Sequence, residues 1–182
     1  MATTYCSAIV ILPPPELWGP IQEIRQEYDK QFRRWMPHIN LIYPFRPRAQ
    51  FDVLLRPLTA ACRNVQPFEV ELTEFHSFVR PHDCVMWLKP DPVEKVIQLH
   101  DAIFEVVPDC DHVRGFEEGF TPHLSVGQII KNKHLEGTLR RLKKIWKPIK
   151  FTVGEVSLLW RDNPPNDVFQ IEQTIRLGGQ QI

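Results

Sequence analysis

The sequence contains two short stretches with the same pattern, MPHINL at residues 36–41 and TPHLSV at residues 121–126. In each stretch, a proline is followed by a histidine, an apolar residue, a small polar residue and a second apolar residue. Successive side chains of a β-strand point to opposite faces of a sheet. Both stretches are therefore predicted to be strands with a histidine and a small polar residue on one face and apolar residues on the other.

The histidines of the two stretches, His38 and His123, are the candidate catalytic residues. Imidazole suits proton transfer near neutrality because its unperturbed pKa is about 6.5. With two imidazoles, one can remove a proton from an attacking oxygen while the other protonates a leaving oxygen, as cleavage of a phosphodiester requires. The Asn40 amide and the Ser125 hydroxyl are expected to donate hydrogen bonds to the phosphate oxygens. This chemistry requires no metal, and we expect no cofactor.

The two stretches lie about 85 residues apart and resemble the paired signatures of the 2H (two-histidine) phosphoesterase superfamily. The flanking residues YPF at 43–45 and FTP at 120–122 also resemble family usage, and the resemblance spans essentially the whole chain. It implies a bilobal α+β fold in which two pseudo-symmetric antiparallel sheets line a central groove, with helices outside. The implied activity is metal-independent hydrolysis of 2′,3′-cyclic phosphates or 2′-5′ phosphodiester bonds in nucleotides or RNA.

One residue departs from the family pattern, because Asn40 stands where the family usually has Thr or Ser. An amide can still donate to phosphate, so we expect an active phosphoric diester hydrolase. Two alternatives remain open. The first is a catalytically weakened module that binds nucleotides or RNA ends, and the second is a scaffold without nucleotide contact. Both histidines could also serve a purely structural role, by satisfying buried hydrogen bonds at the starts of strands.

Four residues outside the signatures are candidates for binding the substrate. Tyr43, Phe45 and Phe78 could stack on a nucleotide base, although aromatic residues at such positions more often belong to a core. Phe78 is chosen because it follows a strand near the groove in the family layout. Arg161 lies just past a predicted strand and could contact a phosphate. The same role is open to the arginines that bracket the first signature, Arg33, Arg34, Arg46 and Arg48.

The rest of the chain predicts an alternation of helices and strands in one domain, residues 1–182. One helix is predicted to begin at Pro20 and to end before Pro37, and Pro57 makes the start of a second helix uncertain. The other predicted elements are strands at 7–12, 38–45, 68–72, 84–88, 121–130, 151–160 and 169–177, and helices at 51–62, 93–107 and 135–146.

The composition is typical of a globular protein, with 43% hydrophobic and 24% charged residues among 182, and it excludes a disordered tail or a coiled coil. The 22 basic and 22 acidic residues cancel, so any nucleic-acid contact must be local. The four cysteines form no Cys-x-x-Cys pair, which favours reduced thiols and a cytoplasmic, or else nuclear, location. We expect no secretory signal, no membrane partner and a monomer that binds a nucleotide or an RNA end.

Overall fold

The computed structural model describes residues 2–112, 119–130 and 134–179. Two short 3-10 helices, Pro15–Leu17 and Arg48–Gln50, precede the first two α-helices. The α-helices are α1 (Trp18–Tyr28), α2 (Phe51–Arg63), α3 (Val93–Phe104) and α4 (Leu135–Ile145). The strands are β1 (Ser7–Ile11), β2 (Ile39–Ile42), β3 (Phe68–Val79), β4 (Asp83–Asp91), β5 (Leu124–Ile130), β6 (Ile149–Val153), β7 (Glu155–Trp160) and β8 (Gln170–Arg176).

All eight strands form one antiparallel sheet in the order β6-β3-β4-β5-β2-β1-β7-β8. Its centre is the narrow junction between β2 and β5, where Ile39 pairs with Leu124. On either side of this junction lie four strands, and each half begins with a strand that carries one of the two sequence signatures. The α+β fold is therefore confirmed, with the two expected sheets joined edge to edge into one ladder.

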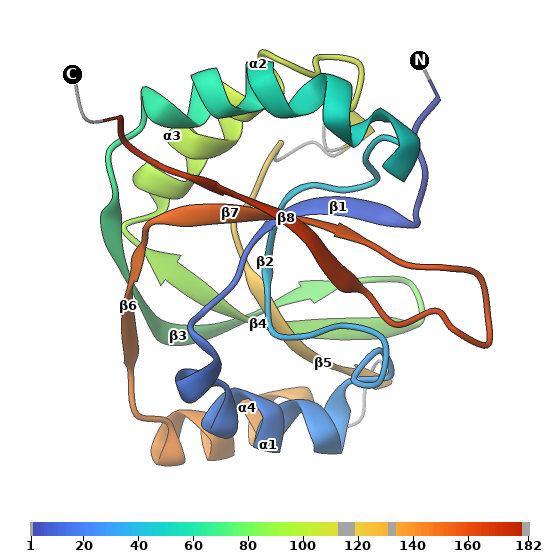
Figure 1. Cartoon of the computed structure of the whole chain (residues 1–182). Helices are drawn as coiled ribbons and strands as arrows, with labels where there is room; N and C mark the ends of the chain where they lie inside the picture. Colours follow the sequence, from blue (N-terminus) through green and yellow to red (C-terminus); the bar gives the residue numbers. More distant parts are fainter. Residues whose placement is uncertain (1, 113–118, 131–133, 180–182) are drawn as a thin grey trace.

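The sheet is curled, and the helices pack against it as two pairs, one at each end of the molecule (Figure 1). In this view α2 and α3 lie above the sheet, α1 and α4 lie below it, and both termini are at the top. Side chains from all four helices share one large core with strand residues such as Ile9, Ile39 and Leu124. Ala8 and Val10 belong to a second, smaller cluster. Because neighbours along β1 point to opposite faces, the two clusters lie on opposite faces of the sheet.

The first helix is shorter than the sequence predicts, because α1 ends at Tyr28 rather than near Pro37. The following residue, Asp29, is extended, and its carboxylate accepts hydrogen bonds from the Gln31 backbone (2.8 Å) and the Arg25 side chain (2.9 Å). Such local bonds from an Asp side chain compete with the helical ladder. The segment from Asp29 to the first signature is therefore turn rather than helix.

The prediction of a single strand at residues 151–160 is also wrong. The segment forms two strands, β6 and β7, which are separated at Gly154. β6 pairs with β3 at one edge of the sheet, whereas β7 lies between β1 and β8 in the other half. Pro57 lies inside α2 without ending it. The hairpin of β3 and β4 is confirmed. Within the described residues, no helix is long and apolar enough to cross a membrane.

Candidate active site

The two signature histidines lie side by side at the centre of the sheet, each directly before one of the two central strands. Ile39 pairs with Leu124 across the junction. Extending this antiparallel register by one residue in each direction places Asn40 opposite His123 and Ser125 opposite His38. Ile39 and Leu124 belong to the large core, so the other four side chains point to the opposite face. We call this face, which carries His38, Asn40, His123 and Ser125, the histidine face.

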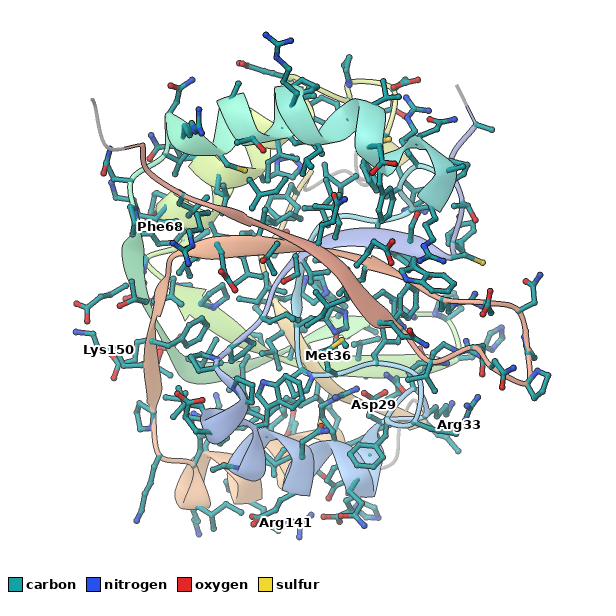
Figure 2. The ribbon with its side chains drawn as sticks, viewed as in Figure 1. Asp29, Arg33, Met36, Phe68, Arg141 and Lys150 are labelled. Carbon is teal, nitrogen blue, oxygen red and sulfur yellow. The ribbon has the colours of Figure 1, made fainter. Side chains whose placement is uncertain are left out.

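Both imidazole rings are held in the same way by the backbone. The Nδ1 of His38 lies 2.7 Å from the Met36 carbonyl oxygen, and the Nδ1 of His123 lies 2.7 Å from the Thr121 carbonyl oxygen. A carbonyl can only accept a hydrogen bond, so Nδ1 carries the proton in both rings. In the neutral rings Nε2 is consequently the unprotonated nitrogen. Figure 2 shows Met36 in the middle of the molecule, where the chain enters β2.

The two rings differ at Nε2. The Nε2 of His38 accepts a hydrogen bond from the Asn40 side-chain amide at 3.2 Å. The structure records no corresponding donor for His123 among the described residues. The Asn40 Oδ1 is buried and has no hydrogen-bond partner in the described part of the chain. The signatures are therefore equivalent in sequence but chemically unequal in the folded protein.

Burial lowers the pKa of both histidines, because it disfavours the charged imidazolium. The pKa of His38 falls to about 4, chiefly through burial, with smaller contributions from the positive charges of Arg25 and His123. Burial also lowers the pKa of His123, and the charge of Arg80 acts in the same direction. The hydrogen bonds to Met36 and Thr121 oppose these shifts. Both rings are therefore neutral at pH 7 in the unliganded protein, and a bound anion would favour their protonation.

An aromatic cluster of Trp35, Tyr43 and Phe169 supports the first histidine. The Trp35 ring stacks on His38 with centroids 4.3 Å apart, and Phe169 stacks on Trp35 at 3.6 Å. Tyr43 meets Trp35 edge-on at 5.3 Å, and its hydroxyl donates to the Tyr5 carbonyl at 3.3 Å. The half-buried Tyr43 is thus part of the surroundings of His38.

A second aromatic cluster, formed by His76, Phe78 and Trp87 of β3 and β4, surrounds the second histidine. Phe78 meets His123 edge-on at 5.0 Å, and Trp87 lies 5.9 Å from the same ring. Phe78 and His76 both stack on Trp87, at 4.9 Å and 4.8 Å. Phe78 is half-buried. The structure therefore brings this predicted residue next to His123.

Arg161 is attached to the first aromatic cluster but does not reach either histidine. Its guanidinium lies 5.4 Å from the centroid of the Phe169 ring, and its Nη1 donates to the Asp162 carbonyl oxygen at 3.0 Å. Its Nε is buried without a hydrogen-bond partner among the described residues. Among the described residues, Arg161 is linked to His38 through the contacts of Phe169 with Trp35 and of Trp35 with His38.

The expectation that Phe45 stacks on a substrate is wrong. Its side chain is fully buried in the large core, with its ring centroid 5.6 Å from that of Phe51 on α2. β2 ends at Ile42, so the alternation that would place residues 43 and 45 on one face does not continue that far. Since the large core lies behind the histidine face, Phe45 cannot contact a ligand bound there.

The arginines that bracket the first signature form ion pairs. Arg33 and Arg34 share the carboxylate of the buried Asp167, at 2.5 Å and 2.6 Å. Arg46 is buried and pairs with Asp109, and Arg48 pairs with Glu172 at 2.9 Å. These pairs join segments that are far apart in the sequence, and the pair of Arg48 and Glu172 connects a 3-10 helix with β8. Figure 2 shows Arg33 beside Asp29, on the segment between α1 and β2.

Three aromatic residues and one cation of the site were not predicted from the sequence. Trp35 precedes the first signature directly, which was the only signal that it could lie near His38. Phe169 reaches the site from the start of β8, and Trp87 pairs with Ser125 across β4 and β5. Arg25 on α1 donates to the Trp35 carbonyl oxygen at 2.9 Å. The contacts of Phe169 and Trp87 depend on long-range strand pairing that local patterns do not encode, whereas Arg25 reaches Trp35 only because the chain turns back after α1.

Comparison with known proteins gives one family and a consistent fold. Residues 13–165 match the family described as the 2′-5′ RNA ligase superfamily. Two bacterial relatives bear the name "Putative phosphoesterase". The Bacillus licheniformis protein is 27% identical over 136 residues, covering 74% of this chain and 78% of its own length. The Staphylococcus aureus strain Newman protein is 24% identical over 170 residues, covering 93% of this chain and 97% of its own length.

Two solved structures share the fold at low sequence identity. Escherichia coli LigT complexed with phosphate has a TM-score of 0.66 and 14% identity, covering 98% of this chain and 100% of LigT. The Thermus thermophilus protein TT0787 has a TM-score of 0.64 and 17% identity, covering 96% of this chain and 99% of TT0787. LigT has also been solved with 3′-AMP and with ATP. At such low identities these likenesses establish the fold alone.

Proposed function

Because the chain belongs to the 2′-5′ RNA ligase superfamily, a family of 2H phosphoesterases, we propose that it hydrolyses 2′,3′-cyclic phosphate or 2′-5′ phosphodiester bonds. Its substrates are nucleotides or RNA ends. The observation that carries this proposal is the matched presentation of His38 and His123. Both lie on the histidine face, and in both the backbone binds Nδ1, which leaves Nε2 for proton exchange.

In the proposed reaction, the phosphorus atom of the substrate lies between the two Nε2 atoms. One imidazole takes a proton from a water molecule as its oxygen forms the new bond to phosphorus. The other, in its protonated form, gives its proton to the 2′ or 3′ oxygen as the old phosphorus–oxygen bond breaks. Exchange of protons with solvent restores both rings. The Ser125 hydroxyl and the Asn40 amide are the proposed donors to the non-bridging oxygens, where negative charge is concentrated.

The aromatic clusters on either side of the histidines supply surfaces for a nucleotide base. Phe78 and Tyr43 are half-buried, and stacking of a base on an aromatic ring contributes about 1–3 kcal/mol. Arg161 is the proposed contact for a second phosphate of a longer substrate, because its guanidinium lies against the Phe169 ring of the first aromatic cluster. The complex of LigT with 3′-AMP, a related fold with a bound nucleotide, supports this class of ligand.

The test is hydrolysis of 2′,3′-cyclic AMP and of 2′-5′ oligoadenylate by the purified protein in the presence of EDTA. Both proton transfers are assigned to imidazoles, so activity should survive removal of divalent metal ions. His38→Ala and His123→Ala should each lower kcat by about 10²–10⁴-fold while the circular dichroism spectrum stays unchanged. Inactivity of the wild-type protein on both substrates, or dependence on a metal, would overturn the proposal.

One observation favours a second candidate, a module that binds nucleotides without turning them over. The Asn40 amide occupies the Nε2 of His38, and this nitrogen is needed for proton transfer. Asn40→Thr separates the two candidates. A gain of more than tenfold in a weak wild-type activity would favour a binding module, whereas robust wild-type activity that the substitution leaves unchanged would exclude it.

A further inference from the structure

The hydrogen bond between Asn40 and His38 has a defined direction. The Nδ1 of His38 must carry a proton, because it faces the Met36 carbonyl oxygen at 2.7 Å. In the neutral ring Nε2 can therefore only accept, so the Asn40 group that faces it at 3.2 Å must be the NH2 group. Protonation of Nε2 would turn this contact into one between two donors. The Asn40 amide would then have to reverse.

Reversal would also satisfy an atom that is unsatisfied in the resting state. The Asn40 Oδ1 is buried and has no partner in the described part of the chain, and an unpaired buried acceptor costs about 1–3 kcal/mol. After a half-turn of the amide, Oδ1 would accept from a protonated His38 Nε2. The NH2 group would then point to the place that Oδ1 held. Since the two ends of an amide are nearly equal in size, the half-turn needs no new volume.

We propose that Asn40 couples protonation of His38 to the binding of a phosphate or sulfate anion on the histidine face, through reversal of its side-chain amide. When the anion binds, His38 Nε2 takes a proton from solvent and donates it in a hydrogen bond shared by Asn40 Oδ1 and the anion, so the proton stays within reach of the substrate oxygens. The Asn40 NH2 group then donates to the anion. This inference rests on the proposed function, because it assumes that the anion occupies the position of the substrate phosphate.

The charges around His38 agree with such a coupling. Arg25 and Asp29 reach it from the α1 side and His123 from β5, and Arg25 itself pairs with Asp29 at 2.8 Å. The neutral Trp35 ring covers one face of the imidazole. None of these groups supplies a carboxylate bonded to Nε2 that would keep the resting ring protonated. An anion would therefore be the charge that makes the protonated form favourable, and Asn40 Oδ1 would accept a hydrogen bond from the protonated ring.

Sulfate is the suitable probe, because it stays a dianion near neutrality and carries no titration of its own. Calorimetry at pH 6 in buffers of different ionisation enthalpy should show net uptake of protons, up to one per sulfate bound. Nitrogen NMR of the imidazole rings should show His38 Nε2 unprotonated in the free protein and protonated with sulfate. The Asn40 side-chain amide signals should shift in the same titration, as their partner changes from nitrogen to an anion.

Two variants and one control isolate the amide. In Asn40→Asp a carboxylate bonds Nε2 permanently, so His38 should be protonated before sulfate is added and the uptake should fall close to zero. Asn40→Thr should retain the uptake, because a hydroxyl can donate or accept. Asn64→Asp makes the same charge change at an exposed residue that ends α2 and should behave as the wild type.

The outcomes separate this inference from the function on which it rests. Sulfate binding without proton uptake at His38, or equal uptake in Asn40→Asp and the wild type, would overturn the coupling and leave the phosphodiesterase proposal standing. If neither sulfate nor 3′-AMP bound to the wild-type protein, the phosphate site itself, and with it the proposed function, would be overturned. Should Asn40→Asp not fold, the NMR titration of the wild type decides alone.

Discussion

Burial is the main physical influence on the pKa values of both signature histidines. His38 is covered by Trp35 and bonded by Asn40, and its pKa falls to about 4. The pKa of His123 is also lowered, again mainly by burial. No carboxylate bonds to either ring in the described part of the chain. The protein therefore holds two neutral imidazoles, and one of them must acquire a proton before it can act as an acid.

The activity should consequently have an acidic pH optimum. The base works unprotonated, so kcat/KM falls as the pH drops through its pKa. The acid works protonated, so kcat/KM falls as the pH rises through its pKa. The pKa of His38 is about 4 and that of His123 lies below its ordinary value of 6.5, so the maximum lies below pH 6.5 whichever ring is the base. Initial rates on 2′,3′-cyclic AMP from pH 4 to 8 measure this profile, and a maximum above pH 7 would contradict it.

The individual elements show how far the sequence could predict the structure. The two signatures identified the central strands and the face of each histidine, because the alternation of side chains is a local property. The end of α1 was missed, since it depends on bonds that the Asp29 side chain makes. The division at Gly154 was missed because apolar residues recur on both sides of it, and only pairing with β3 and β1 separates the two strands. Phe45 was misassigned for a related reason, because β2 ends early.

The contact between α1 and β5 gives an element-level prediction about Gly127. A Cβ atom at this position would collide with the Cβ and backbone of Tyr28, so Gly127→Ala should push α1 away from the sheet. We expect the free energy of unfolding to fall by about 1–3 kcal/mol, as for overpacked cores.

Gly137→Ala is the matched control, because it lies in α4 and nothing would come within 4 Å of a Cβ atom added there. There alanine should be neutral or stabilise by up to about 1 kcal/mol. Urea denaturation measures both, and equal effects would contradict the packing argument.

The buried ion pair of α1 leads to a second prediction. Arg25 and Asp29 have side chains that are 2% and 5% exposed, and Arg25 also binds the Trp35 carbonyl oxygen. Arg25→Met leaves Asp29 buried without its partner, which typically costs about 3–5 kcal/mol. It should also lower kcat/KM, because Trp35 stacks on His38.

The matched comparison is Arg141→Gln. Arg141 pairs with Glu27 at the exposed surface of α1 and α4, at the bottom of the molecule in Figure 2. Exposed pairs contribute about 1 kcal/mol or less, so this variant should be nearly as stable as the wild type and fully active. Equal destabilisation of the two arginine variants in thermal unfolding would contradict the argument that burial makes loss of the Arg25 pair the more costly change.

In the whole molecule, the two signature histidines lie together because the two halves of the sheet meet at one strand pair. Ile39 and Leu124 form this junction, and the histidine of each half lies one residue before it. The repeated sequence pattern was enough to select the two histidines as candidate catalytic residues. The family resemblance added the prediction that both line one central groove. The aromatic surroundings could not be predicted from the sequence. Trp87 lies near His123 because β4 pairs with β5, and Phe169 packs on Trp35, which in turn stacks on His38.

The central claim is that His38 and His123 act together on one phosphorus atom, and a double-mutant cycle tests it most directly. The measurement is kcat/KM for 2′,3′-cyclic AMP with EDTA present, for the wild type, His38→Ala, His123→Ala and the double variant. We predict that each single substitution lowers the rate by about 10²–10⁴-fold and that the double variant is little worse than the poorer single one, because both act in one step. Losses that multiply in the double variant, or a single variant with a rate close to that of the wild type, would contradict the account.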